Sequence, residues 1–398
     1  MELYLQFGHG MMGHTRHLIG EWGGSGVILS PRDLDANQMI GLANDVQDLG
    51  GTALLDPQCF ARDADHRRLV SHDYWQVISD HSTGAFLGGA GTAALLSELS
   101  KLSTSMSLTQ HILPGCLAQT VNEDWFALQE AVIAEAPSHF DVDGIIATIA
   151  LSCEVMRSEA QVEAVVERAA DWNVSGYYIV PETPSAYLVD DPSWLANLLV
   201  LASGLKLSDK KTIVGYCNHQ MLCLASADTD SIASGTWLNV RSFPPEKFYN
   251  PDDDQMSRRT TWYYCPQALS EYKLQFLDIA QRSGVLHDLA PAAGLGSHYG
   301  DPLFAGPQPT TINWGEQNAF RHYLTCLHSQ VATSRQATFD DTIANHRSLL
   351  DDATSTLAIT RSNGVLGQNR EFYDYLDVNR SALTIYERAR GARMRRAW

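Results

Sequence analysis

The chain has 398 residues, of which 44% are hydrophobic and 19% are charged, as expected of a globular protein that buries a large core. This length predicts two structural units, and the net charge of −18 argues against nucleic-acid binding except through a local basic patch. The seven cysteines are scattered without a CxxC pair, which argues against disulfides or a zinc knuckle and predicts a cytoplasmic protein. The start, MELYLQFGHG, lacks the features of a signal peptide, and no run of apolar residues is long enough to predict a membrane span.

Short apolar or β-branched segments recur along the first 240 residues, and most are followed by a helical pattern. The predicted strands are Leu3–Phe7, Val27–Leu29, Thr52–Leu55, Ser107–Leu113, Ile145–Leu151, Gly176–Val180, Thr212–Tyr216 and Ser231–Ala233. The glycine- and histidine-rich segment GHGMMGHTRH follows the first strand. It lacks the apolar helix start of a dinucleotide-binding motif, so we expect no nucleotide cofactor there.

Helical spacing and capping residues separate these strands. Asp35 with Gln38, and Ser158 with Gln161, have the pattern of a capping box, and Asn122 is a candidate N-cap. Helices are predicted at 39–49, 92–102, 125–136, 162–169, 194–205 and 219–227. Eight strands alternating with helices within the first 249 residues predict a (β/α)8 TIM barrel, with an open doubly wound sheet as the alternative.

Two regions depart from this alternation. Residues 58–90 are rich in polar residues and glycine, which predicts an insertion over the mouth of the barrel. Residues 250–398 contain an acidic loop, a Gly/Pro/Ala-rich segment and several helical patterns, and they predict a mostly helical C-terminal region.

The final residues, ERARGARMRRAW, concentrate positive charge in an acidic chain: Arg388, Arg390, Arg393, Arg395 and Arg396. Such a tail either pairs with acidic neighbours or contacts the phosphates of a nucleotide or nucleic acid. A protein partner or a second copy of the chain is a further hypothesis for the helical region.

In a (β/α)8 barrel, residues at the carboxyl ends of the strands meet at one rim, where the ligand chemistry of such barrels is found. Taking the residues at the predicted strand ends, the candidate acid, base or nucleophile positions are Asp56 and Glu182, together with Asp80 in the insertion. The candidate substrate-binding residues are His9, Arg32, His111, Asn218, His219, Ser234, Gly235 and Thr236. Small residues at 234–236 would let backbone N–H groups approach a phosphate or ribose. Asp56, before a proline, is equally typical of a simple turn.

Metal binding is a weaker hypothesis. His9 and His14 are five residues apart across flexible glycines, which is not a spacing that places two imidazoles on one metal. His9, His111 and His219 could still meet across a barrel and serve a metal-assisted hydrolase. We otherwise expect neither a metal nor another cofactor.

Two segments resemble the tRNA-guanine transglycosylase-like barrels, including their DNA-modifying relatives. VISDHSTGAF is similar to the family's strand-end aspartate, which is followed by small residues and an aromatic, and VGYCNHQMLCLASADTDSIASG is similar in spacing to its seventh strand, helix and eighth strand. The resemblance implies that Asp80 engages a nucleobase. The chain departs from the family at its nucleophilic aspartate, where it has Ala233, Ser234 and Gly235, and at its cysteine-rich zinc site.

Three functions therefore follow as hypotheses. The first is an enzyme that acts on a nucleoside or nucleobase, by transglycosylase-like base exchange on nucleic acid. The second is the metal-assisted hydrolase, and the third is a catalytically inactive barrel that serves as an interaction subunit.

Overall fold

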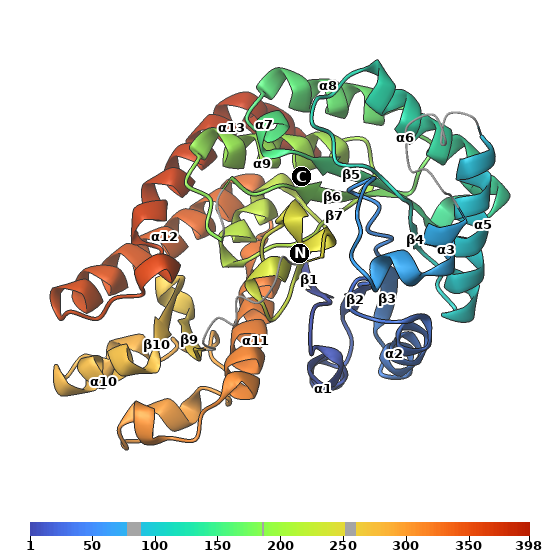
Figure 1. Cartoon of the computed structure of the whole chain (residues 1–398). Coiled ribbons are helices and arrows are strands. Elements are labelled where there is room, and N and C mark those ends of the chain that lie inside the picture. The colour runs from blue at the N-terminus through green and yellow to red at the C-terminus, as the bar shows by residue number, and fades with distance from the viewer. Residues whose placement is uncertain (78–88, 185–186, 251–259) are drawn as a thin grey trace.

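The computed structural model describes residues 1–77, 89–184, 187–250 and 260–398 (Figure 1). At its centre lie eight parallel strands in the spatial order β3-β2-β1-β8-β7-β6-β5-β4. Their bounds are β1 (Glu2–Gln6), β2 (Gly26–Leu29), β3 (Thr52–Leu55), β4 (His111–Ile112), β5 (Ile145–Leu151), β6 (Gly176–Pro181), β7 (Lys211–Val214) and β8 (Ser231–Ser234).

This strand order is that of a (β/α)8 barrel. β1 pairs with both β2 and β8, which an open doubly wound sheet does not allow, and β3 and β4 form the two ends of the ring. The barrel is therefore nearly closed, with one seam between β3 and β4. The predicted fold class is confirmed.

Helices cover the outside of the barrel in chain order (Figure 1). They are α1 (Met12–Trp22), α2 (Ala36–Asp48), α3 (Asp73–Gln76), α5 (Ala90–Ser105), α6 (Glu123–Glu135), α7 (Cys153–Met156), α8 (Glu159–Ala169), α9 (Pro192–Lys206) and the 3-10 helix η4 (His219–Ala227). The predicted caps are present: Asp35 and Gln38 form a reciprocal capping box, and Asn122 accepts from the Trp125 N–H. Ser158 caps α8, but the Gln161 side chain bonds the Val121 N–H instead of completing the box.

Two local predictions were wrong. The GHGMMGHTRH segment is not a loop, because α1 begins at Met12 and buries Thr15, Leu18 and Ile19 on one face. Its glycines hid this narrow apolar face in the sequence. The fourth strand is shorter than predicted, since Ser107 has a φ of +54°, which is incompatible with an extended strand.

Aromatic side chains fill the inside of the barrel, and glycines make room for them. Tyr4 on β1 pairs with Gly26 on β2, where a Cβ atom would lie 2.5 Å from the tyrosine ring. A Cβ on Gly215 would likewise lie 2.5 Å from the Tyr178 hydroxyl. The glycines at 26 and 215 are therefore needed for packing, and the barrel interior is a filled core.

The C-terminal region contains a two-stranded sheet and four long helices. Its elements are β9 (Trp262–Cys265), β10 (Ser270–Lys273), α10 (Leu274–Arg282), α11 (Glu316–Ser334), α12 (Phe339–Ser362) and α13 (Leu376–Ala397). α11 packs against β1 and α1, and α13 packs along α9, so the helices lie against the β8–β1 side of the barrel (Figure 1). A domain boundary at 249/250 stays a prediction. In the part of the chain described here, no helix is both long and apolar enough to cross a membrane.

Within the predicted insertion, residues 58–77 contain the 3-10 helix η1 (Leu69–Ser71) and α3. Asp80 and the VISDHSTGAF similarity lie largely outside the described residues.

Candidate active site at the barrel rim

A pocket of about 530 Å³ opens at the carboxyl-end rim, where the loops after β3 and β4 meet across the seam. The Leu117 N–H donates to the Phe60 carbonyl at 3.0 Å and joins the two loops. The lining residues are Phe60, Ala61, Arg62, Asp63, Cys116, Leu117, Ala118, Gln119, Thr120, Asn122, Asp124, Trp125, Pro245 and Tyr249. This volume is typical of a site for a small molecule.

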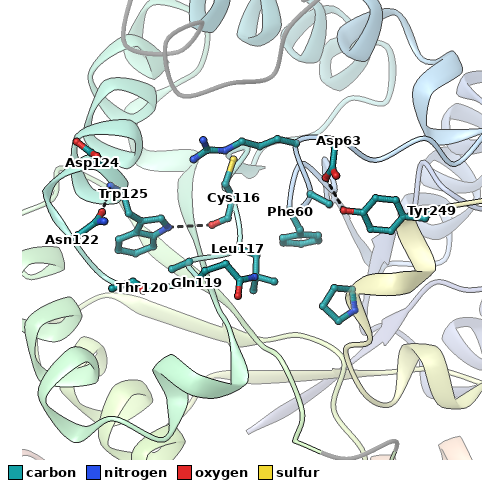
Figure 2. A pocket seen from close by; sticks show the side chains of 14 residues that line it. Phe60, Asp63, Cys116, Leu117, Gln119, Thr120, Asn122, Asp124, Trp125 and Tyr249 are labelled. Atoms are coloured by element: carbon teal, nitrogen blue, oxygen red, sulfur yellow. Dashed lines mark hydrogen bonds between the residues drawn. The ribbon is translucent and has the colours of Figure 1, made fainter.

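Aromatic and polar groups alternate around the pocket (Figure 2). Trp125 lies on one side, where its indole N–H donates to the Cys116 carbonyl at 3.1 Å. On the other side, the Tyr249 hydroxyl donates to Asp63 at 2.6 Å, and this hydrogen bond raises the Tyr249 pKa to about 12. Gln119 lies between them and is exposed. The pocket therefore offers flat apolar faces with amide and carboxylate groups at their edges.

A buried carboxylate lies deeper in the barrel mouth. Asp56 follows β3 and is 1% exposed; it accepts hydrogen bonds from the Tyr216 hydroxyl at 2.9 Å and the Gln58 N–H at 2.9 Å. The Tyr178 hydroxyl is 3.3 Å away. Burial raises the Asp56 pKa to about 6, although these donors and the nearby Lys247 charge oppose the rise. A carboxyl group with this pKa exchanges protons near neutral pH.

Lys247 covers this carboxylate and its tyrosines. Its ammonium nitrogen lies 3.6 Å from the centre of the Tyr216 ring and donates to the Asn239 carbonyl at 3.1 Å. Burial lowers the Lys247 pKa to about 7, and the Arg32 charge lowers it further, against the attraction of Asp33 and Asp56.

The predicted residue Arg32 belongs to the same cluster through backbone and side-chain contacts. Its N–H donates to the Gln58 amide oxygen at 2.9 Å, and its guanidinium donates to the Lys247 carbonyl at 2.5 Å. It also pairs with Asp33 at 3.1 Å. These bonds occupy Arg32, so it positions the cluster around Asp56.

Glu182 lies at another part of the rim, directly after β6. Its carboxylate accepts from the Cys153 N–H at 3.0 Å and is half-buried. Burial raises the Glu182 pKa, the Cys153 N–H opposes this, and the Glu246 and Glu154 charges add to the rise. Neither Glu182 nor Asp56 lines the pocket at the seam, so the structure does not bring them together in one described cavity.

The rim over β7, β8 and β1 is covered by the C-terminal region. Arg241, which follows β8, lies 3.2 Å from both carboxylate oxygens of Glu271 on β10, and Arg370 lies 2.9 Å from one of them. The Tyr187 hydroxyl donates to the same carboxylate at 2.6 Å. Burial alone would raise the Glu271 pKa, but the Arg241 and Arg370 charges hold it at about 2.

The predicted binding residues on β7 and β8 lie beneath this cover. Ser234 and Thr236 are buried, and Gly235 is a packing residue whose Cβ would lie 2.5 Å from the Gln6 carbonyl. Thr236 lines a cavity of only about 30 Å³, which is too small for a phosphate or ribose. The prediction failed because the sequence did not show that the C-terminal region covers this part of the rim.

Asn218 and His219 are also covered. Asn218 caps η4 and donates to the Tyr187 carbonyl at 2.8 Å. His219 is fully buried among the rings of Tyr187, Tyr264 and Phe372, and burial lowers its pKa to about 4. Both residues hold the C-terminal region to the barrel.

The other two histidines lie far from His219 in the fold. His9 is exposed after β1, whereas His111 is the first residue of β4 and therefore lies at the opposite end of the barrel. His111 bonds Ser103 at 2.7 Å and stacks on Phe140. In the described segments, no group of three His, Cys, Asp or Glu side chains comes together in a way that could hold a metal ion.

The Arg-rich end of the chain forms the last turns of α13. Arg390 is buried and pairs with Glu163, and Arg395 pairs with Asp340 at 2.9 Å. Arg388, Arg393 and Arg396 are exposed. Part of the basic tail thus pairs with acidic neighbours, and a nucleic-acid contact through the exposed arginines stays a proposal.

Comparisons with known proteins give no family. No protein-family model and no curated protein matches the sequence. Three remote structural similarities were found. They are a glycoside hydrolase family 30 subfamily 8 xylanase, Xyn30A, from Clostridium acetobutylicum (11% identity, 61% of this chain, TM-score 0.36), the carboxyl transferase domain of Rhizobium etli pyruvate carboxylase (10%, 98%, 0.35) and a D-psicose 3-epimerase (10%, 92%, 0.25).

The alignments cover 65%, 78% and 100% of those chains, so the match to the xylanase spans just under two thirds of its length. At such low TM-scores we take no substrate or reaction from these proteins. None of the three is a transglycosylase, and of the resemblance only the barrel fold, shown by the strand order, is supported.

Sequence reasoning missed most of the residues that line the pocket and surround Asp56. Phe60, Gln119, Trp125 and Tyr249 lie in loops or at a helix start, and nothing in their spacing marks them. Gln6 gave a signal, because it is a polar residue at the end of an otherwise apolar strand. It lies inside the barrel, 3.2 Å from the Tyr178 hydroxyl.

Proposed function

We propose that this barrel is an enzyme that binds a nucleobase or nucleoside in the rim pocket and acts at its glycosidic bond. The observation that carries the proposal is the pocket itself. It combines the aromatic residues Phe60, Trp125 and Tyr249 with the amide groups of Gln119 and Asn122. Proteins recognise an isolated base by stacking on its faces and by hydrogen bonds to its edges.

Acid–base chemistry would come from the carboxylates near the mouth. Glycosidic bonds are cleaved or exchanged by pairs of carboxyl groups with different pKa values. Asp56 and Glu182 both have raised pKa values, and Asp80 is the third candidate. Because positions 233–235 carry no carboxylate, a nucleophile would have to come from a strand other than β8. Base exchange on tRNA or DNA is the finer form of this proposal.

Titration calorimetry with guanine, 7-deazaguanine and guanosine tests the binding step, with xylose as the control. We expect at least one purine to bind with a Kd below about 1 mM, equivalent to about −4 kcal/mol, and xylose not to bind. Binding of xylose without any purine would contradict the proposal and point to a sugar substrate. Incorporation of labelled guanine into tRNA or DNA tests the reaction itself.

An inactive interaction subunit is the second candidate, and a specific observation favours it. Asp56 is almost fully buried, and half of the rim is covered by the chain's own C-terminal region. If a purine binds but Asp56→Asn and Glu182→Gln leave any base exchange unchanged, these carboxylates are not catalytic and this second function is favoured.

A further inference from the structure

Between the pocket and Asp56 lies a short segment that we call the strap, residues 245–250. It contains the 3-10 helix η6 (Pro245–Phe248) and crosses from the end of the barrel to the loop after β3. Two of its residues, Pro245 and Tyr249, form a wall of the pocket. The strap thus has the pocket on one side and the Asp56 cluster on the other.

Exposed polar residues fasten the strap to the loop after β3. The Asn250 N–H donates to Asp65 at 2.7 Å, its side-chain amide donates to the Asp65 carbonyl at 2.8 Å, and Tyr249 donates to Asp63 at 2.6 Å. The His66 N–H donates to the Phe248 carbonyl at 3.0 Å. Asp63, Asp65 and Asn250 are exposed, so water can replace these hydrogen bonds at little cost.

The inner side of the strap consists of apolar contacts and one cation. Phe248 packs on Phe60 and Phe243, with ring centres 5.5 and 5.9 Å apart, and Lys247 lies on Tyr216. The Tyr216 hydroxyl contacts Asp56. Only this layer of aromatic rings and the Lys247 side chain separates the pocket from the carboxylate.

The groups under the strap are not fully satisfied in this closed arrangement. The Gln6 side-chain nitrogen is buried and has no hydrogen-bond partner in the described part of the chain. An amine and a carboxyl group are held away from water in the same place, which is unfavourable for their charged forms. Unpaired and desolvated polar groups of this kind are typical of sites completed by a substrate or by water.

We propose that the strap is a lid, which opens by releasing its contacts with Asp63 and Asp65 and thereby connects the rim pocket with Lys247, Tyr216 and Asp56. The inference deepens the proposed function, because it explains how a substrate in the pocket reaches a buried acid. When the lid is closed, water is excluded from the carboxylate; when it is open, the aromatic layer moves with η6.

Chemical labelling of lysines tests the lid without any ligand. The protein is treated with trinitrobenzenesulfonate, which reacts with accessible neutral amines, and the modification of each lysine is followed by peptide mass spectrometry. The wild type is compared with a double variant, Tyr249→Phe and Asn250→Ala, which loses exposed fastening hydrogen bonds. Lys211, half-buried at the amino end of β7, is the internal control.

We expect Lys247 to react about tenfold to thirtyfold faster in the double variant, as the loss of about two hydrogen bonds implies, while Lys211 reacts at the same rate in both proteins. Hydrogen exchange at the His66 amide should accelerate in parallel, with β6 unchanged, which shows that the variant is folded. Equal Lys247 rates in two folded proteins would overturn the proposal. So would a wild-type Lys247 that reacts as fast in the native protein as in urea.

The two proposals fail in distinguishable ways. If no purine binds but Lys247 labelling rises as expected, the lid is supported and the assigned substrate is wrong. If a purine binds but the labelling rate does not change, the pocket is supported and the strap is a fixed wall.

Discussion

The two halves of the barrel rim use polar residues for opposite purposes. Over β3, β4 and β5 the rim is open, and exposed amides and carboxylates surround a pocket of about 530 Å³. Over β7, β8 and β1 the polar residues are buried and bonded to one another under the C-terminal region, and the cavity there measures about 30 Å³. The same end of the same strands therefore provides a candidate binding site in one half and an internal interface in the other.

The difference follows from where the chain supplies a cover. Glu271 and Arg370 reach the β8 loop from the C-terminal region and satisfy Arg241 there. In the open half, the cover described here is the strap, whose fastening residues are exposed. Changes in the covered half should thus alter stability, whereas changes in the open half should alter ligand binding and motion.

The largest expected effect is in the covered half. Glu271→Gln removes the charge that compensates two arginines and should lower the free energy of unfolding by about 3–5 kcal/mol, because a buried partner is left uncompensated. Urea unfolding measures this. Asp45→Asn, which removes the exposed partner of Arg16, is the control and should cost at most about 1 kcal/mol. Similar losses in both variants would mean that the covered half is not a buried interface.

The next effect concerns Asp56 and depends on pH. Because its folded pKa of about 6 lies above its ordinary value of 3.8, the folded state binds the extra proton between these values. The stabilisation is complete below pH 3.8 and is lost as the pH rises through 6, by about 3 kcal/mol in total. Asp56→Asn cannot titrate, so its stability relative to wild type should increase from pH 4 to pH 6.5.

Urea unfolding of both proteins across this range measures the effect. The groups that face Asp56 are Lys247, Tyr178 and Tyr216; the lysine, with a pKa of about 7, stays largely protonated below pH 6.5, and the tyrosines titrate far above this range. A stability difference that is constant with pH would show that Asp56 is solvated, in conflict with a closed strap.

The sequence predicted the barrel well because its signals are local. Alternating strands and helices, the Asp35 capping box and the Asn122 cap depend on neighbouring residues, and all are present in the structure. The same reasoning placed Asp56, Arg32 and Glu182 correctly at the carboxyl-end rim. It could not tell which part of the rim is open, because that depends on contacts between residues far apart in the chain.

Three errors show this limit. Ser234 and Thr236 have the composition of an anion site, but Arg241 and the distant Glu271 and Tyr323 close that part of the rim. His111 was expected at a strand end, but the positive φ of Ser107 delays the strand, so the histidine opens it instead. Long-range packing and single backbone conformations of this kind have no periodic signal in the sequence.

The smallest effect on stability, and the sharpest test of the comparison, is expected at Gln119. Its side chain is exposed and lines the pocket, so Gln119→Ala should change the free energy of unfolding by less than about 0.5 kcal/mol. If its amide bonds the edge of a base, the variant should bind a purine about fivefold more weakly, as the loss of one hydrogen bond implies. Gln317→Ala, an exposed glutamine on α11 in the covering region, is the matched control and should leave both quantities unchanged. Equal binding by the wild type and both variants would mean that Gln119 does not contact the ligand. Weaker binding in the Gln317 variant alone would place the ligand site over the covered half, and would reverse the assignment of the two halves.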